Sequence, residues 1–172
     1  AGARDCLQRS RYDVHDLDVI IFTSITRFHG GLNFCVEPGI SLLIKRELGL
    51  REDVLHFDIT NACAGMMTGL KILDSMIRSG AVTCGRVVSG ECITPISETA
   101  LKEIKDPIDA QFASLTVGDS GAAFILDQAQ GDDQIDFVDL FAVARFADLC
   151  YGMPSDQNPG VAMYTRAMEI HG

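Results

Sequence analysis

The stretch LHFDITNACAGMMTGLKILDSMIRSG, residues 55–80, joins two patterns of different period. Its first five residues are a short, largely apolar run of the kind found in strands. Its second part repeats apolar side chains at helical spacing, at Met66, Leu70, Leu73 and Ile77. A glycine at position 80 is a common helix end. The stretch therefore predicts a strand over 55–59 that turns into a helix over 64–80.

Cys63 lies at this junction, and two interpretations of it stay open. Unpaired N–H groups and the positive dipole end of a helix favour a thiolate, which is the nucleophilic form of cysteine. The small neighbours Ala62, Ala64 and Gly65 leave its sulfur approachable, and strand-to-helix turns present nucleophiles in acyl-transfer enzymes. Cysteine is also among the most often buried residues, so geometry alone gives a packing role about even weight.

The pattern continues outward on both sides of this stretch. Further strands are predicted at 18–24, 85–91, 121–127 and 133–147, and helices at 1–10 and 40–49. The polar segment 92–116 is expected to be a surface loop, and 150–172 a loop that runs into a helix. Strands that alternate with helices indicate an α/β fold with a mixed, mostly parallel five-stranded sheet flanked by helices.

Composition narrows the possible functions. The 172 residues fit one domain, and a net charge of −10 argues against nucleic acid and anionic membrane surfaces as partners. No apolar run approaches the roughly 20 residues that span a bilayer. The chain has six cysteines without a CxxC pair and four isolated histidines, so neither a disulfide framework nor a metal site is expected. These features favour a reducing, cytoplasmic location.

Four segments in this order carry a resemblance to a known family: DLDVIIFTS (16–24), ISLLIKRELGL (40–50), DITNACAG (58–65) and DPIDAQFASLTVGDSGAAFIL (106–126). Together they resemble the β-ketoacyl-acyl-carrier-protein synthase III family of the thiolase superfamily, over residues 1–127. The resemblance implies a thiolase-like layered fold, with 1–172 as an N-terminal condensing-enzyme domain cut at both ends.

The same resemblance implies roles for individual residues. Cys63 would be the acylated nucleophile. A loop at the interface of a homodimer, over 27–36, would shape the acyl pocket through Phe28, His29, Leu32 and Phe34. Leu115 and Thr116 would also contact substrate. A supporting turn would be formed by Gly118, Asp119, Ser120 and Gly121. The turn reads GDSG where the family has GDGA, and Ala110 and Gln111 follow Asp109 where the family often has an arginine near the nucleotide of CoA.

The implied activity is a decarboxylative Claisen condensation in fatty acid or polyketide biosynthesis. Acyl-CoA would load Cys63, and a malonyl thioester, on CoA or on an acyl carrier protein, would accept the acyl group without a bound cofactor. The family's catalytic His and Asn belong to a C-terminal half that we expect on a longer chain or a partner. The alternatives are a non-catalytic structural or heterodimer partner, transfer to an alcohol or amine, and a hydroxymethylglutaryl-CoA or chalcone-type synthase.

Overall fold

The computed structural model describes residues 2–28 and 34–166, which fall into two compact units. The first unit contains Ala1–Glu91 and Ser120–Leu140, and the second contains Cys92–Asp119 and Phe141–Gly172. Each unit is described by itself below.

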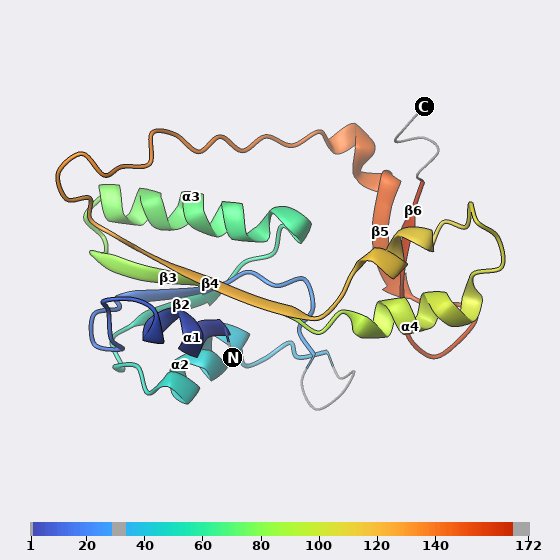
Figure 1. The fold of residues 1–172 in the computed structure, drawn as a ribbon, viewed down its shortest axis with the longest axis horizontal. Coiled ribbons are helices and arrows are strands. Elements are labelled where there is room, and N and C mark those ends of the chain that lie inside the picture. The colour runs from blue at the N-terminus through green and yellow to red at the C-terminus, as the bar shows by residue number, and fades with distance from the viewer. Residues whose placement is uncertain (1, 29–33, 167–172) are drawn as a thin grey trace. The chain divides into compact units, whose positions relative to one another are not determined.

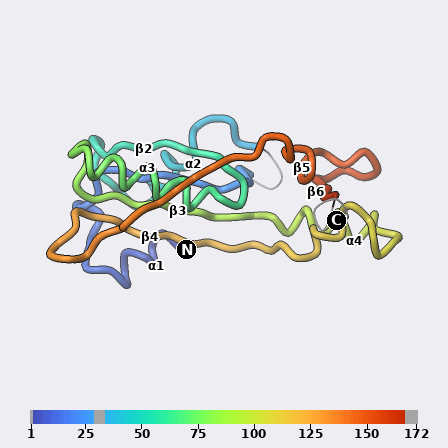
Figure 2. Tube along the Cα trace, turned by 90° about the horizontal axis from the view of Figure 1, so that it is seen from above, coloured from blue at the N-terminus to red at the C-terminus, as the bar shows by residue number. Residues whose placement is uncertain are grey.

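The first unit is built on a four-stranded sheet in the order β2-β1-β3-β4. Its strands are β1 (Val19–Phe22), β2 (Leu55–Asp58), β3 (Cys84–Glu91) and β4 (Ser120–Asp127). β1 pairs in parallel with β2 and β3, whereas β4 runs antiparallel to β3 over eight residue pairs (Figure 2). The expected mixed, mostly parallel sheet is therefore confirmed, with four strands in place of five.

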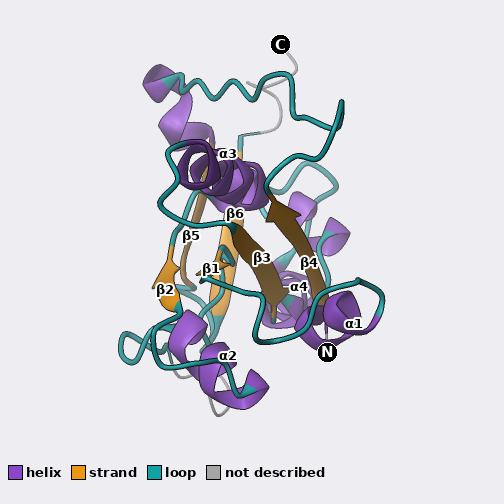
Figure 3. Cartoon of the chain, turned by 90° about the vertical axis from the view of Figure 1, so that its left-hand side faces the viewer, coloured by secondary structure: helices purple, strands orange, loops and turns teal. Residues whose placement is uncertain are grey.

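Helices cover both faces of this sheet (Figure 1, Figure 3). α1 (Gly2–Gln8) and α2 (Ile40–Leu48) lie on one face, and α3 (Gly65–Arg78) lies on the other. Alternate residues of β1 supply both cores, because successive strand side chains point to opposite faces. Ile20 belongs to the cluster on the α1 and α2 side, while Val19 and Ile21 pack with Leu73 of α3.

The second unit combines α4 (Thr94–Glu103) with a hairpin of β5 (Cys150–Pro154) and β6 (Val161–Thr165). The carboxylate of Glu103, buried on α4, ties the two together. It accepts hydrogen bonds from Asn158 Nδ2 at 3.0 Å, Gln111 Nε2 at 2.7 Å and Ser155 Oγ.

Three predictions in this part of the chain are wrong. Residues 92–116 contain α4 and a 3-10 turn over Phe112–Thr116, because Pro95 occupies the first turn of the helix, where proline starts helices instead of breaking them. Residues 133–143 form no strand and 144–149 form a 3-10 turn. Phe137 and Phe141, which a strand of the buried sheet would be expected to cover, are 78% and 91% exposed. Where a loop was expected from residue 150 onward, the chain forms the β5–β6 hairpin, and the last part of the predicted loop and helix, residues 167–172, lies outside the described residues.

Candidate functional site

Cys63 lies between the end of β2 and the start of α3, as the sequence predicts. It is exposed in a one-turn 3-10 segment, Ala62–Ala64, directly before the 14-residue helix α3. The preceding residue, Ala62, has a φ of 43°, in the left-handed region that residues other than glycine seldom adopt. Such strain persists where surrounding contacts fix the backbone, and it is often found at functional sites. The turn presents the thiol of Cys63 to solvent at a helix N-terminus.

Hydrogen bonds from the residues on either side fix this turn. Asn61 Nδ2 donates to Thr68 Oγ1 at 2.7 Å, and Thr68 Oγ1 donates to the carbonyl of Ala64 at 3.0 Å. The N–H of Ala64 closes the turn on the carbonyl of Asn61, also at 3.0 Å. The backbone on both sides of Cys63 is therefore fixed by hydrogen bonds, although the thiol itself is exposed.

Glycines bring α3 unusually close to the sheet. A Cβ atom on Gly65 would lie 2.5 Å from the carbonyl oxygen of Thr23, just after β1. A Cβ on Gly69, one turn further, would lie 2.7 Å from Val87 Cγ1 on β3. Only a residue without a side chain fits at Gly65, so this glycine sets the position of the helix that begins after Cys63.

Polar groups gather where the neighbouring parallel strands end. The N–H groups of Ile25 and Thr26 donate to the carboxylate of Glu91 at 2.7 and 3.0 Å, and Thr26 Oγ1 donates to it at 2.7 Å. Ser24 Oγ accepts the N–H of Gly90 at 2.6 Å. Because parallel strands end at one edge of a sheet, these groups share that edge with the Cys63 turn. In α/β folds this edge is where ligands bind.

Asp58, the last residue of β2, was not singled out from the sequence. Its carboxylate accepts the N–H groups of Ile40 and Ser41, both at 2.9 Å, at the start of α2, and it lies 3.8 Å from Arg27 Nη1. The sequence contained only an indirect indication of this capping role. α2 follows Pro38 and Gly39, so the helix has no capping side chain of its own and needs one from elsewhere.

The other predicted site residues divide between the two units. Phe28 and Phe34 form an isolated antiparallel bridge in the first unit, whereas His29 and Leu32 lie outside the described residues. Leu115 and Thr116 lie in the 3-10 turn of the second unit, and both are exposed. Their contact with substrate stays a prediction.

The predicted supporting turn spans the boundary between the units. Gly118 and Asp119 end a segment of the second unit, and Ser120 and Gly121 begin β4. The carboxylate of Asp119 accepts the N–H groups of Ile93 and Thr94 at 2.7 and 2.8 Å, at the start of α4. The pKa of Asp119 is lowered mainly by its hydrogen bonds from Thr94. Asp119 therefore anchors a helix end.

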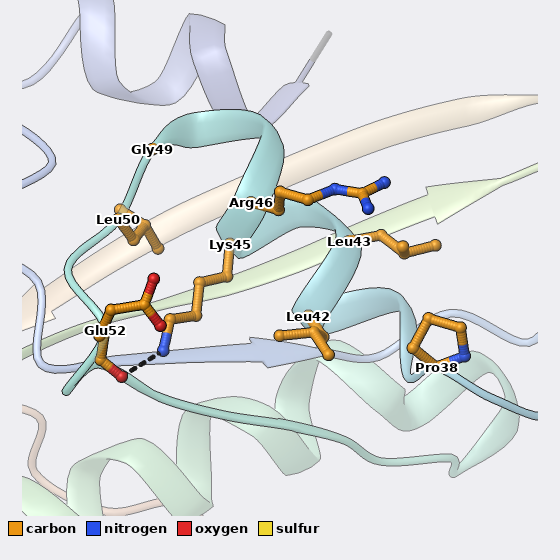
Figure 4. A pocket seen from close by; sticks show the side chains of 8 residues that line it. All are labelled: Pro38, Leu42, Leu43, Lys45, Arg46, Gly49, Leu50 and Glu52. Atoms are coloured by element: carbon orange, nitrogen blue, oxygen red, sulfur yellow. Dashed lines mark hydrogen bonds between the residues drawn. The ribbon is translucent and has the colours of Figure 1, made fainter.

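A pocket of about 390 Å³ on α2 contains none of the predicted site residues (Figure 4). Lys45, its buried cation, donates to the carbonyls of Glu52 and Val54 at 2.7 and 2.8 Å. Its hydrogen bonds are satisfied within the protein, so we assign the pocket no part in the site.

Over residues 2–28 and 34–166, no three His, Cys, Asp or Glu side chains are grouped as metal ligands would be. None of the helices in these ranges has both the length and the apolar character to cross a membrane.

Comparison with known proteins gives a consistent family assignment. The family model for 3-oxoacyl-[acyl-carrier-protein (ACP)] synthase III matches residues 57–143, just over half of the chain, and this range includes Cys63. A β-ketoacyl-[acyl-carrier-protein] synthase III of Coxiella burnetii is 32% identical over 148 residues, which cover 86% of this chain and 41% of the relative. An acyl-CoA:acyl-CoA alkyltransferase of Xanthomonas campestris is 25% identical over 135 residues, 75% of this chain and 38% of the relative.

Solved structures show the same fold. A Xanthomonas campestris OleA variant with bound lauric acid and lauroyl-CoA superposes with a TM-score of 0.76 at 21% identity, covering 99% of this chain and 50% of the OleA chain. The chain spans about two fifths of the length of the curated relatives it matches. The expected thiolase-like α/β fold is thereby confirmed.

Proposed function

Because the chain belongs to the 3-oxoacyl-[acyl-carrier-protein] synthase III family, we propose that Cys63 is the acylated nucleophile of a condensing acyltransferase. The observation that carries this proposal is the exposed thiol on a strained, hydrogen-bonded turn between β2 and α3. The protein would act on thioesters, and it would need no bound cofactor.

In the first half-reaction, the Cys63 thiolate attacks the carbonyl carbon of an acyl-CoA. A new S–C bond forms, the bond to CoA breaks, and CoA leaves as a thiol after it takes up a proton. The backbone N–H of Cys63, at the start of the helix, is a candidate donor to the oxyanion of the tetrahedral intermediate. Splitting the transfer into two steps through an acyl-enzyme is the usual logic of covalent catalysis.

In the second half-reaction, a carbon nucleophile takes the acyl group from Cys63. We propose a malonyl thioester on CoA or on an acyl carrier protein as this nucleophile, in fatty acid or polyketide biosynthesis. It loses CO₂ and forms a C–C bond with the acyl carbon, while the S–C bond to Cys63 breaks and Cys63 leaves as a thiolate. The name of the Xanthomonas relative supports a second candidate acceptor, another acyl-CoA. We also propose a homodimer through residues 27–36, where Phe34 is 62% exposed.

Loading of Cys63 can be tested without the acceptor. The chain is incubated with acetyl-CoA, octanoyl-CoA or lauroyl-CoA, and intact-protein mass spectrometry measures the acyl increment. We expect one acyl group per chain, which hydroxylamine removes, as it does other thioesters. Cys63→Ala should abolish the increment. Cys150→Ala is the matched control, because Cys150 is also exposed but lies in the second unit, and it should load normally.

The outcomes distinguish a condensing enzyme acylated at Cys63 from a non-catalytic partner. Loading that persists in Cys63→Ala would contradict the assignment of the nucleophile. No loading of a chain extended to the full length of its relatives would favour the non-catalytic partner. If loading occurs, adding malonyl-CoA or a second acyl-CoA identifies the acceptor by the mass of the released product.

A further inference from the structure

A side-chain bridge crosses the Cys63 turn from one end to the other. Thr68 Oγ1, in the first turn of α3, accepts a hydrogen bond from Asn61 Nδ2 at 2.7 Å and donates one to the carbonyl of Ala64 at 3.0 Å. Asn61 lies two residues before Cys63, and Ala64 directly follows it. The N–H of Ala64 donates to the carbonyl of Asn61, also at 3.0 Å. These hydrogen bonds therefore form a closed ring that encloses Cys63.

The bond from Thr68 to Ala64 is of a common kind, whereas the bond from Asn61 is particular to this turn. Hydroxyl groups inside helices often donate to the carbonyl four residues earlier, as Ser75 Oγ of α3 does to Lys71 at 2.8 Å. The hydroxyl of Thr68 also accepts from a side chain that precedes the helix. In the described part of the chain, no other side chain hydrogen-bonds to residues 61–64. Thr68 is thus their one side-chain link to α3 there.

The ring holds a strained backbone in place. Ala62 has a φ of 43°, and a residue with a Cβ keeps such a value only where its surroundings impose it. A rotation at Ala62 would move every atom that follows, first of all the N–H and the thiol of Cys63. The Asn61–Thr68 bridge opposes that rotation, because it ties the residue before Ala62 to the helix after Cys63. The hydroxyl of Thr68 therefore controls where the Cys63 N–H points.

We propose that Thr68 is a positioning residue for the acylation of Cys63, and that it acts by aiming the Cys63 N–H at the oxyanion. This inference rests on the proposed function. When the thiolate adds to the acyl-CoA carbonyl, an S–C bond forms and an electron pair moves onto the oxygen. The N–H donates to this oxyanion until the pair returns, the bond to CoA breaks, and CoA takes up a proton. A donor accelerates such a step when it is aimed in advance. Thr68 touches no substrate in this scheme.

Two reactions of the same thiol separate positioning from reactivity. Transfer from octanoyl-CoA passes through an oxyanion, whereas alkylation by iodoacetamide forms an S–C bond, expels iodide and makes no oxyanion. Thr68→Val keeps the shape of the side chain and removes its hydroxyl. We expect it to slow acylation about tenfold, which is part of the loss caused by removal of an oxyanion donor. The rate of alkylation and its pH profile should stay unchanged, and Thr68→Ser should restore most of the acylation rate. Peptide mass spectrometry measures both reactions at Cys63.

Ser75→Ala is the matched control. It removes the same kind of hydrogen bond from α3, about two turns further from Cys63, and should be acylated at the wild-type rate.

The outcomes distinguish failure of this inference from failure of the proposed function. No loading of Cys63, in this chain and in one extended to the length of its relatives, contradicts both. If wild type loads, the positioning role alone is overturned when Thr68→Val loads equally fast, or when acylation and alkylation slow equally. If urea unfolding shows that Thr68→Val does not fold, Asn61→Ala, at an exposed residue, replaces it with the same expected results.

Discussion

Gly65 determines how closely the helix after Cys63 can approach the sheet. An alanine Cβ there would lie 2.5 Å from the carbonyl oxygen of Thr23, which belongs to the backbone and cannot rotate away. We expect Gly65→Ala to lower the free energy of unfolding by about 1–3 kcal/mol, as overpacking does, and to slow acylation of Cys63 by moving its turn. Urea unfolding and the rate of loading measure the two effects.

Gly90→Ala is the matched control for this prediction. Gly90 is in β3 of the same unit, and a Cβ there would meet nothing within 4 Å. The Gly90→Ala substitution should therefore leave both the free energy of unfolding and the acylation of Cys63 nearly unchanged. Equal effects of the two substitutions would mean that backbone freedom, and not the contact with Thr23, explains Gly65.

The sequence allowed Cys63 to be placed because the change of period at 55–80 is local. The strain at Ala62 and the capping role of Asp58 could not be predicted in this way. Ala62 takes its φ of 43° from hydrogen bonds around it, and Asp58 meets its partners 17 and 18 residues earlier in the chain. Both features depend on which residues the fold brings together, and residue type alone does not encode that.

Helix α2 depends on a residue from another element for its start. The side chain of Asp58 in β2 is 7% exposed, and its carboxylate accepts the first two N–H groups of α2. Asp58→Ala should lower the free energy of unfolding by about 2 kcal/mol, the upper range for loss of a helix cap. Asp53→Ala is the control, because Asp53 is 75% exposed and forms a surface ion pair with Arg51. Similar losses in the two variants, measured by urea unfolding, would contradict the capping role.

Among the elements, those with continuous apolar runs were predictable and those that rely on partners were not. The four strands of the first unit were located from such runs. α4 was missed because its buried face consists of Ile96, Thr99, Ala100 and Glu103, of which two are polar. Glu103 is buried only because Ser155, Asn158 and Gln111 satisfy its carboxylate. A strand was predicted over 133–147, but no strand in the described part of the chain pairs with these residues.

Acid should destabilise the second unit through Glu103. Hydrogen bonds from Ser155 first, and then from Asn158 and Gln111, lower its pKa below the ordinary 4.5. A carboxylate with a lowered folded pKa stabilises the fold above its unfolded pKa, and this contribution is lost as pH falls through the folded value. Stability should thus decline below about pH 4.5. Glu103→Gln should flatten this decline in urea unfolding from pH 3 to 7, whereas Glu98→Gln, an exposed change on the same helix, should not.

Alkali should destabilise the first unit through Cys84. Burial raises the pKa of this thiol from 9.0 to about 11, so the folded state holds its proton more tightly than the unfolded chain. The neutral thiol therefore contributes fully to the free energy of unfolding below pH 9. This contribution, about 3 kcal/mol at most, is lost as pH rises toward 11. Cys84→Ala leaves a small cavity and lowers stability at every pH, but it should abolish this slope in urea unfolding from pH 7 to 11. Cys150→Ala, at an exposed thiol of the second unit, should keep the slope. A slope that survives in Cys84→Ala would assign the alkaline transition to another group, such as Tyr12 or Tyr164, whose pKa values burial also raises.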